Sequence, residues 1–179
     1  MNDGKLTGVR LGGSGGQGVI LCSVILARAA LAAGHYTAQS QSYGPEARGG
    51  SCKAETVISD APIDYPKVEK SDVFLALTQS AMEKYLPQCA PGSLLILDAG
   101  LTPPTGTDLK ILSYPILSAA AEELGKPMVA NIVAAGILGR SLALFDDEAL
   151  RRAVLASVPK GTGELNLRAL ETGFRLAGE

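Results

Sequence analysis

The fold of this chain is decided by one stretch near its start, Leu6-Thr7-Gly8-Val9-Arg10-Leu11-Gly12-Gly13-Ser14-Gly15-Gly16-Gln17-Gly18. Residues 6–11 are mostly apolar and predict a strand that runs directly into glycines. Residues 17–33 are apolar on most faces and predict a helix, which Gly34 ends because glycine readily adopts the left-handed conformation found after helices. A strand, a glycine turn and a helix in this order indicate an α/β fold.

The rest of the chain alternates predicted strands and helices. Further strands are expected at residues 35–41, 51–58, 73–77, 94–97 and 109–112, and helices at 80–86, 116–124, 129–144, 148–157 and 165–177. The first two of these strands form a candidate hairpin, which favours a mixed sheet over a purely parallel one. The prediction is therefore an α/β fold in one domain over residues 1–179, a three-layer sandwich with a mostly parallel, mixed sheet.

Single residues refine this prediction. The strand at 51–58 alternates in polarity and predicts a sheet with one partly exposed face. Asp146 is expected to cap the helix that follows it, and Asn131 to cap or begin the long helix around residue 132. Gly136 on that helix allows close backbone packing. His35, the only histidine, and Cys22 are both expected to be structural.

Composition excludes several classes of protein. The 179 residues are 46% hydrophobic and carry a net charge of −2, which argues against disorder and against nucleic acid as a partner. The longest nearly apolar run, residues 19–33, is too short to span a membrane and is preceded by too many glycines to be a signal peptide. Three cysteines without metal-type spacing do not make a disulfide framework, a zinc site or an iron–sulfur site. A cytoplasmic location is expected.

A first candidate site is the glycine loop, whose Gly13, Ser14, Gly15, Gly16, Gln17 and Gly18 fit the pattern GxGxxG. Free backbone N–H groups at the start of a helix favour an anion, so a phosphate or other anion is one ligand class. Dinucleotide-binding folds also place an acid at the end of the second strand, but residues 38–42 contain none. The alternatives are a tight structural turn or subunit contact, an anion site, and NAD(P) binding.

A second candidate site is the segment Ser42-Tyr43-Gly44-Pro45-Glu46-Ala47-Arg48-Gly49-Gly50. Gly-Pro forces a turn, and paired glycines let the backbone approach a ligand or a neighbouring subunit. Glu46 and Arg48 either form a solvated ion pair or leave Arg48 to address a carboxylate or phosphate. The predicted substrate or subunit contacts are Tyr43, Gly44, Glu46, Arg48, Gly49 and Gly50.

These loops resemble those of the gamma subunit of 2-oxoacid:ferredoxin oxidoreductases. The resemblance is carried by GGSGGQGV at 12–19, SYGPEARGG at 42–50 and VISD at 57–60, and it continues through residues 72–77 to 164–173. It therefore covers nearly the whole chain in order. Residues 54–60 and 62–66 are most like the 2-oxoglutarate type, and the types acting on pyruvate or branched-chain 2-oxoacids remain alternatives.

The resemblance implies a fold like domain III of pyruvate-ferredoxin oxidoreductase and a subunit with no catalytic residue of its own. It implies alpha and beta subunits as partners, with a ferredoxin-like delta subunit in some complexes. Thiamine diphosphate, Mg, iron–sulfur clusters and coenzyme A would serve the complex, with none bound by this chain alone. The rivals are a self-sufficient NAD(P)-dependent oxidoreductase and a non-enzymatic nucleotide sensor. Self-association of the isolated chain is left open.

Overall fold

The computed structural model describes residues 5–42 and 50–178 of the chain. Its centre is one six-stranded sheet with the order β2-β3-β1-β4-β5-β6. The strands are β1 (Leu6–Ser14), β2 (Tyr36–Gln41), β3 (Ser51–Ser59), β4 (Ser71–Ala76), β5 (Cys89–Asp98) and β6 (Lys110–Tyr114). The helices are α1 (Val19–Ala32), α2 (Gln79–Tyr85), α3 (Ile116–Ser118), α4 (Ala130–Leu142), α5 (Asp147–Leu155) and α6 (Gly163–Gly178).

The sheet is mixed because one of its strands runs against the others. β1, β4, β5 and β6 pair in parallel, whereas β3 is antiparallel to both β1 and β2. β2 and β3 form the predicted hairpin, with Tyr36 opposite Ser59 and Gln41 opposite Ala54. The predicted mostly parallel, mixed sheet is confirmed.

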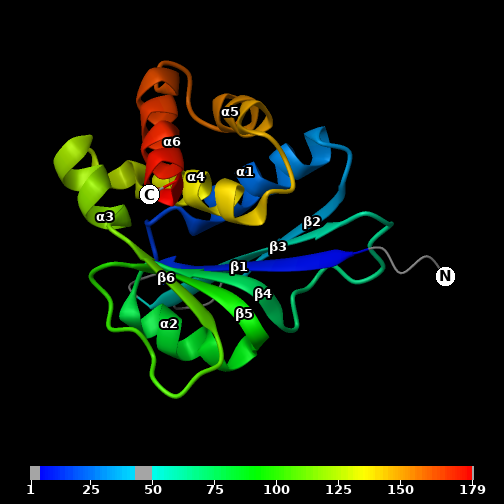
Figure 1. Cartoon of the computed structure of the whole chain (residues 1–179). Helices are drawn as coiled ribbons and strands as arrows, with labels where there is room; N and C mark the ends of the chain where they lie inside the picture. Colours follow the sequence, from blue (N-terminus) through cyan, green and yellow to red (C-terminus); the bar gives the residue numbers. More distant parts are fainter. Residues whose placement is uncertain (1–4, 43–49, 179) are drawn as a thin grey trace.

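Helices cover both faces of this sheet, but unequally. α1, α4, α5 and α6 lie on one face, and α2 lies on the other, as Figure 1 shows. The three-layer arrangement expected from the sequence is thus confirmed, with a thick and a thin helical layer. None of the helices described here combines the length and the apolar character needed to cross a membrane.

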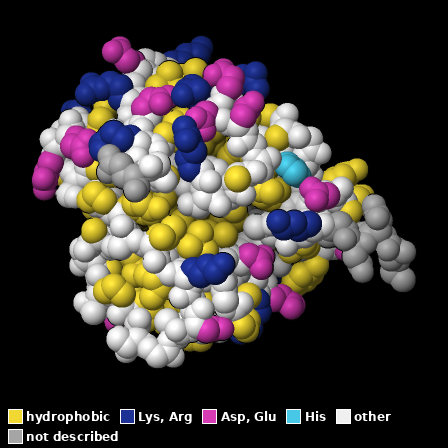
Figure 2. Space-filling view, viewed as in Figure 1, with side chains coloured by type: hydrophobic (Ala, Val, Ile, Leu, Met, Phe, Trp, Pro, Cys, Tyr) yellow, Lys and Arg dark blue, Asp and Glu magenta, His cyan; other side chains and the backbone are white. Residues whose placement is uncertain are grey.

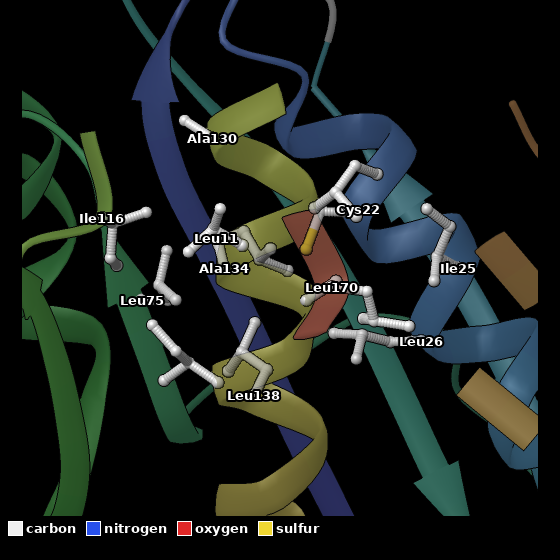
Figure 3. Close-up of a cluster of buried hydrophobic side chains, with 14 of the residues drawn as sticks. Leu11, Cys22, Ile25, Leu26, Leu75, Ile116, Ala130, Ala134, Leu138 and Leu170 are labelled. Atoms are coloured by element: carbon white, nitrogen blue, oxygen red, sulfur yellow. The ribbon is translucent and has the colours of Figure 1, made fainter. Parts of the chain in front are cut away.

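The main core lies between the sheet and the thicker helical layer. Figure 3 shows side chains from β1, β4, α1, α4 and α6 turned toward one another, among them Leu11, Leu26, Leu75, Leu138 and Leu170. α4 is the centre of this layer, since every residue from Ala130 to Gly139 is buried. A smaller core under the other face packs Phe74 and Leu97 against Met82 and Tyr85 of α2. Burial of this apolar surface is the main force that holds the layers together.

Several boundaries differ from those expected from the sequence. β5 begins at Cys89 rather than at residue 94, because Ser71 pairs with Cys89 ahead of an irregularity in the β4–β5 register. The expected helix at 116–124 is one turn of α3 followed by a π-helical turn, Ala119–Glu123. The expectation that one face of β3 is partly exposed is wrong for Glu55 and Val57, which are only 5% and 1% exposed. Residues 60–70 pass over this face, where Val68 accepts a hydrogen bond from Arg10.

Candidate functional site

The carboxyl ends of the parallel strands meet at one edge of the sheet, and the direction of the crossovers changes there. α1 follows β1 and returns the chain to β2 over one face, whereas α2 follows β4 and leads to β5 over the other (Figure 1). Ligands of open α/β sheets bind at such switch points, outside the carboxyl ends of the strands. The glycine loop follows β1 at this edge, so its position matches that of a binding loop.

The glycine loop is held in shape by its own side chains. Gln17 folds back so that its Oε1 accepts a hydrogen bond of 2.7 Å from the backbone N–H of Ser14. Gly16 and Gly18 have φ angles of 89° and 71°, which residues with a Cβ rarely adopt. Among the described residues, no side chain caps the first turn of α1. The first N–H groups of the helix are therefore candidates to bind a ligand or another subunit.

Asn131 links the glycine loop to α4. Its Nδ2 donates a hydrogen bond of 3.2 Å to the carbonyl oxygen of Gly18, and the residue is 4% exposed. A Cβ at Gly18 would lie 2.5 Å from the same nitrogen, so the contact requires glycine. Asn131 lies in the first turn of α4, directly after its first residue, Ala130. The N-cap residue is Val129, and the asparagine side chain does not cap the helix. Its role is to hold the loop against the helical layer.

A cavity of about 280 Å³ lies beside the glycine loop. It is lined by Ser14, Gly15, Gly16, Gly18, Val19, Ile20, Ser42 and Cys52. Ser42 follows β2 and Cys52 belongs to β3, so the flanks of the second predicted loop border the same space. The hairpin thus brings the attachment points of both sequence-predicted sites to one edge.

Most of the second predicted site lies outside the described residues. Tyr43, Gly44, Glu46, Arg48 and Gly49 belong to this part, so their contacts stay predictions. Gly50, the last of the set, is half-buried and directly precedes β3.

The end of β2 gives no support to the NAD(P) alternative. It presents Ser40 and Gln41 where a dinucleotide-binding fold places a carboxylate for the ribose. Another acid at a strand end, Asp98 of β5, is separated from β2 by three strands and is bound to backbone N–H groups. Its two oxygens accept hydrogen bonds of 2.9 Å from Gly100 N–H and 2.8 Å from Leu117 N–H. Asp98 therefore holds the backbone at Gly100, just after β5, and at Leu117 of α3.

The cysteines and the histidine do not form a reactive group. Cys22 is completely buried in the main core, where desolvation raises the pKa of its thiol well above the ordinary value. Cys52 borders the glycine-loop cavity, and Cys89 begins β5. The imidazole of His35 lies 2.9 Å from both Asp60 Oδ1 and the Leu144 carbonyl oxygen, which is the structural role expected for it. In the described part of the chain, no three His, Cys, Asp or Glu side chains gather as metal ligands.

A buried charge network was not anticipated from the sequence. Arg10 of β1 is 1% exposed, and its Nε donates a hydrogen bond of 2.7 Å to Glu55 Oε1. Lys53 Nζ lies 2.8 Å from the same oxygen. Burial alone raises the pKa of Glu55, but hydrogen bonds and charges from Lys53 and Arg10 outweigh it and lower that pKa below its ordinary value. The sequence signal that could have indicated this network is Arg10, a charged residue inside the predicted strand at residues 6–11.

Charged side chains on the outer surface follow a different pattern. Figure 2 shows them mixed in sign over the helical layer, with hydrophobic side chains between them and lower on the same face. Several form exposed pairs, such as Arg151 with Glu171 at 2.7 Å and Arg175 with Glu123 at 2.6 Å. Exposed pairs of this kind contribute little to stability.

Comparison with known proteins identifies the family. The family model described as pyruvate ferredoxin/flavodoxin oxidoreductase matches residues 8–176. The chain is 45% identical to the 2-oxoglutarate synthase subunit KorC of Methanocaldococcus jannaschii, over 96% of this chain and 94% of that protein.

Two solved structures share the fold. A keto/oxoacid ferredoxin oxidoreductase gamma subunit from Geobacter sulfurreducens superposes with a TM-score of 0.88 at 39% identity, over 97% of each chain. A 2-oxoglutarate:ferredoxin oxidoreductase from Magnetococcus marinus, with 2-oxoglutarate, coenzyme A and succinyl-CoA bound, has a TM-score of 0.85 at 24% identity. The match covers 97% of this chain but 31% of that one, and at this identity it shows the fold alone. The resemblance predicted from the two loops is confirmed: the chain belongs to the pyruvate ferredoxin/flavodoxin oxidoreductase family, among its gamma subunits.

Proposed function

We propose that this chain is the gamma subunit of a 2-oxoacid:ferredoxin oxidoreductase whose substrate is 2-oxoglutarate. The observation that carries the proposal is the 45% identity to a 2-oxoglutarate synthase subunit over nearly the full length of both chains. In this reaction 2-oxoglutarate and coenzyme A yield succinyl-CoA and CO₂, and two electrons pass to ferredoxin or a similar acceptor. Residues 1–179 act as one gamma domain of the complex, in the cytoplasm.

The chain contributes structure and not chemistry to this reaction. Thiamine diphosphate would supply the carbanion chemistry, and Mg and iron–sulfur clusters would serve the complex. Among the described residues no three His, Cys, Asp or Glu side chains gather as metal ligands, and each carboxylate oxygen of Asp98 accepts a backbone hydrogen bond. The proposal therefore places these groups on alpha and beta subunits, and on a ferredoxin-like delta subunit where one is present.

The two loops are the proposed points of contact with the assembled site. Residues 13–18 lead directly into the first turn of α1, which no described side chain caps, and the flanks of residues 43–50 border the same cavity of about 280 Å³. In this proposal the glycine loop takes an anionic group or a neighbouring backbone. Arg48, with Tyr43, Gly44, Glu46, Gly49 and Gly50, meets a catalytic subunit, the substrate or coenzyme A. Arginine suits such a role because its planar fork binds carboxylates and phosphates.

The name of a relative supports the proposal of a partner. The Methanocaldococcus jannaschii protein, which is 45% identical, is a subunit of a 2-oxoglutarate synthase.

The test is an anaerobic native purification through a tag on this chain, followed by dye-reduction assays. We expect larger subunits in stoichiometric amounts, iron–sulfur absorbance and bound thiamine diphosphate. Dye reduction should need both coenzyme A and a 2-oxoacid, with a higher kcat/KM for 2-oxoglutarate than for pyruvate or 2-oxoisovalerate. Omission of coenzyme A is the control. Preference for another 2-oxoacid would contradict the substrate, and a lone chain that binds NAD(P) would contradict the subunit role.

A further inference from the structure

A second pocket, of about 250 Å³, lies on the face of the sheet opposite α1. It is lined by Ser40, Gln41, Ser42, Lys53, Glu55 and Lys67. Neighbouring residues in a strand point to opposite faces, so Cys52 faces the glycine-loop cavity while Lys53 faces this pocket. The two spaces therefore open on opposite faces of the sheet, and Ser42, just after β2, lines both of them.

The negative charge of the Glu55 carboxylate in this pocket is offset by the buried guanidinium of Arg10. Glu55 Oε1 receives the Arg10 Nε–H at 2.7 Å, and the remaining donors of Arg10 reach the carbonyl oxygens of Val68 at 2.6 Å and Gln88 at 2.9 Å. Arg10 is buried and has one carboxylate partner, so its charge offsets that of Glu55. The floor of the pocket is thus close to neutral, although it contains a carboxylate.

Positive charge remains at the rim. The Lys53 ammonium lies 2.8 Å from Glu55 Oε1 and keeps a quarter of its side chain exposed, so it has donors left for a ligand. Lys67 is exposed and lines the same pocket from the segment that crosses the sheet. Ser40 and Ser42 add hydroxyl groups at the wall, and the Ser40 hydroxyl donates a long hydrogen bond of 3.4 Å to Glu55 Oε2. Two lysines, two hydroxyls and a neutralised floor make a concave, cationic site.

We propose that this pocket binds a small anion that carries a phosphate or carboxylate group. Lys53 and Lys67 supply the charge, and the serine hydroxyls supply further hydrogen bonds. Glu55 orients Lys53 toward the pocket, and Arg10 holds Glu55 in place. Ser42 also lines the glycine-loop cavity, but the charges of this site come from Lys53 and Lys67, which do not line that cavity. The proposal does not rest on the proposed function, so its failure would leave the proposed function untouched.

The test is calorimetric titration of the full-length chain at low ionic strength, with sodium phosphate and, separately, sodium succinate. Lys67→Gln removes one exposed charge and should weaken binding about fivefold, as expected for a partly solvated charge pair. Lys110→Gln is the matched control, because Lys110 is an exposed lysine on β6 at the opposite edge of the sheet. Binding should also weaken in high salt.

A second measurement locates the anion directly. Acetylation of lysines, followed by mass spectrometry, should show Lys53 and Lys67 protected by the bound anion and Lys110 unprotected. Protection by phosphate alone or by succinate alone identifies the group that the site prefers, and either supports the proposal. Equal affinities for Lys67→Gln, Lys110→Gln and the natural chain would overturn it. Protection of Lys67 in the assembled complex without added anion would also overturn it, by placing a partner's acidic side chain there.

Discussion

Gly136 of α4 and Gly173 of α6 touch backbone to backbone where the two helices cross. A methyl group added to either glycine would lie 2.9 Å from the Cα atom of the other. A methyl group on Gly136 would also lie 2.6 Å from the carbonyl oxygen of Leu170. Because α4 is the buried centre of its layer, this crossing sets how closely α6 can cover the core.

Gly173→Ala should therefore destabilise the chain by about 1–3 kcal/mol, since the added methyl group meets backbone atoms that cannot move aside. Alanine favours a helix more than glycine does, but by only about 1 kcal/mol. Urea unfolding monitored by circular dichroism measures the change. Gly178→Ala near the end of the same helix is the control, because its Cβ would meet no atom within 4 Å and it should not destabilise. Equal midpoints for both variants would show that the crossing is not tight.

Gly18→Ala should be more damaging than Gly16→Ala. Both positions have positive φ angles, so both substitutions carry the same backbone strain, about 1–2 kcal/mol. Only the Cβ at Gly18 would strike Asn131, whereas the space around Gly16 is open. We expect a lower Tm for Gly18→Ala than for Gly16→Ala by differential scanning fluorimetry. Similar values would mean that the contact between the loop and α4 is easily rearranged.

Glu55→Gln should lower the free energy of unfolding by about 3–5 kcal/mol at neutral pH, because it leaves the buried Arg10 charge without its carboxylate counter-charge. The exposed pair of Arg140 and Asp147 is the control, and Asp147→Asn should cost about 1 kcal/mol or less. Chemical denaturation at pH 7 compares the two variants. A change for Glu55→Gln no larger than that for Asp147→Asn would contradict the role of the network.

The same carboxylate should shape the acid sensitivity of the fold. The pKa of Glu55 is lower in the folded chain than the ordinary value of 4.5, so the unfolded chain takes up its proton first. Its contribution is fully present above pH 4.5 and is lost as the pH falls through the lower, folded value. Unfolding free energies measured from pH 6 downward should fall less steeply for Glu55→Gln than for the natural chain. Parallel curves would contradict the pKa shift.

Arg48→Ala should reduce activity only in the assembled complex. Loss of one charge-assisted hydrogen bond costs about 1.5–3 kcal/mol, which corresponds to roughly a tenfold loss or more in kcat/KM for coenzyme A or the 2-oxoacid, or in subunit affinity. Arg168→Ala, an exposed arginine on α6, controls for the loss of charge. Steady-state kinetics and size-exclusion chromatography separate turnover from assembly. Unchanged kinetics together with unchanged assembly would remove Arg48 from the proposed contact.

Much of the fold could be predicted because its signals are local. The strand at β1, the glycine turn, the β2–β3 hairpin and the Asp146 cap each depend on neighbouring residues, and the structure confirms them. Asp146 accepts a hydrogen bond of 2.7 Å from Ala149 N–H, as its position before α5 predicted. Gly136 permits the close packing expected of it.

What could not be predicted depends on contacts between distant residues. Glu55 looked exposed because β3 alternates in polarity, and only residues 60–70, passing over that face, bury it. Asn131 looked like a helix cap, yet its partner is Gly18, which is 113 positions away in the sequence. The glycine loop was found from its pattern, whereas the pocket at Lys53 and Lys67 draws on three separate segments and has no sequence signature.

The single reversed strand has a consequence for how the protein can change. Because β3 returns antiparallel to β2, the register of Gln41 with Ala54 fixes both attachment points of residues 43–49 on the sheet. Related subunits that keep this register therefore keep the same two attachment points, whatever residues stand between them. The pairing of β2 with β3 is thus independent of the sequence that joins the two strands.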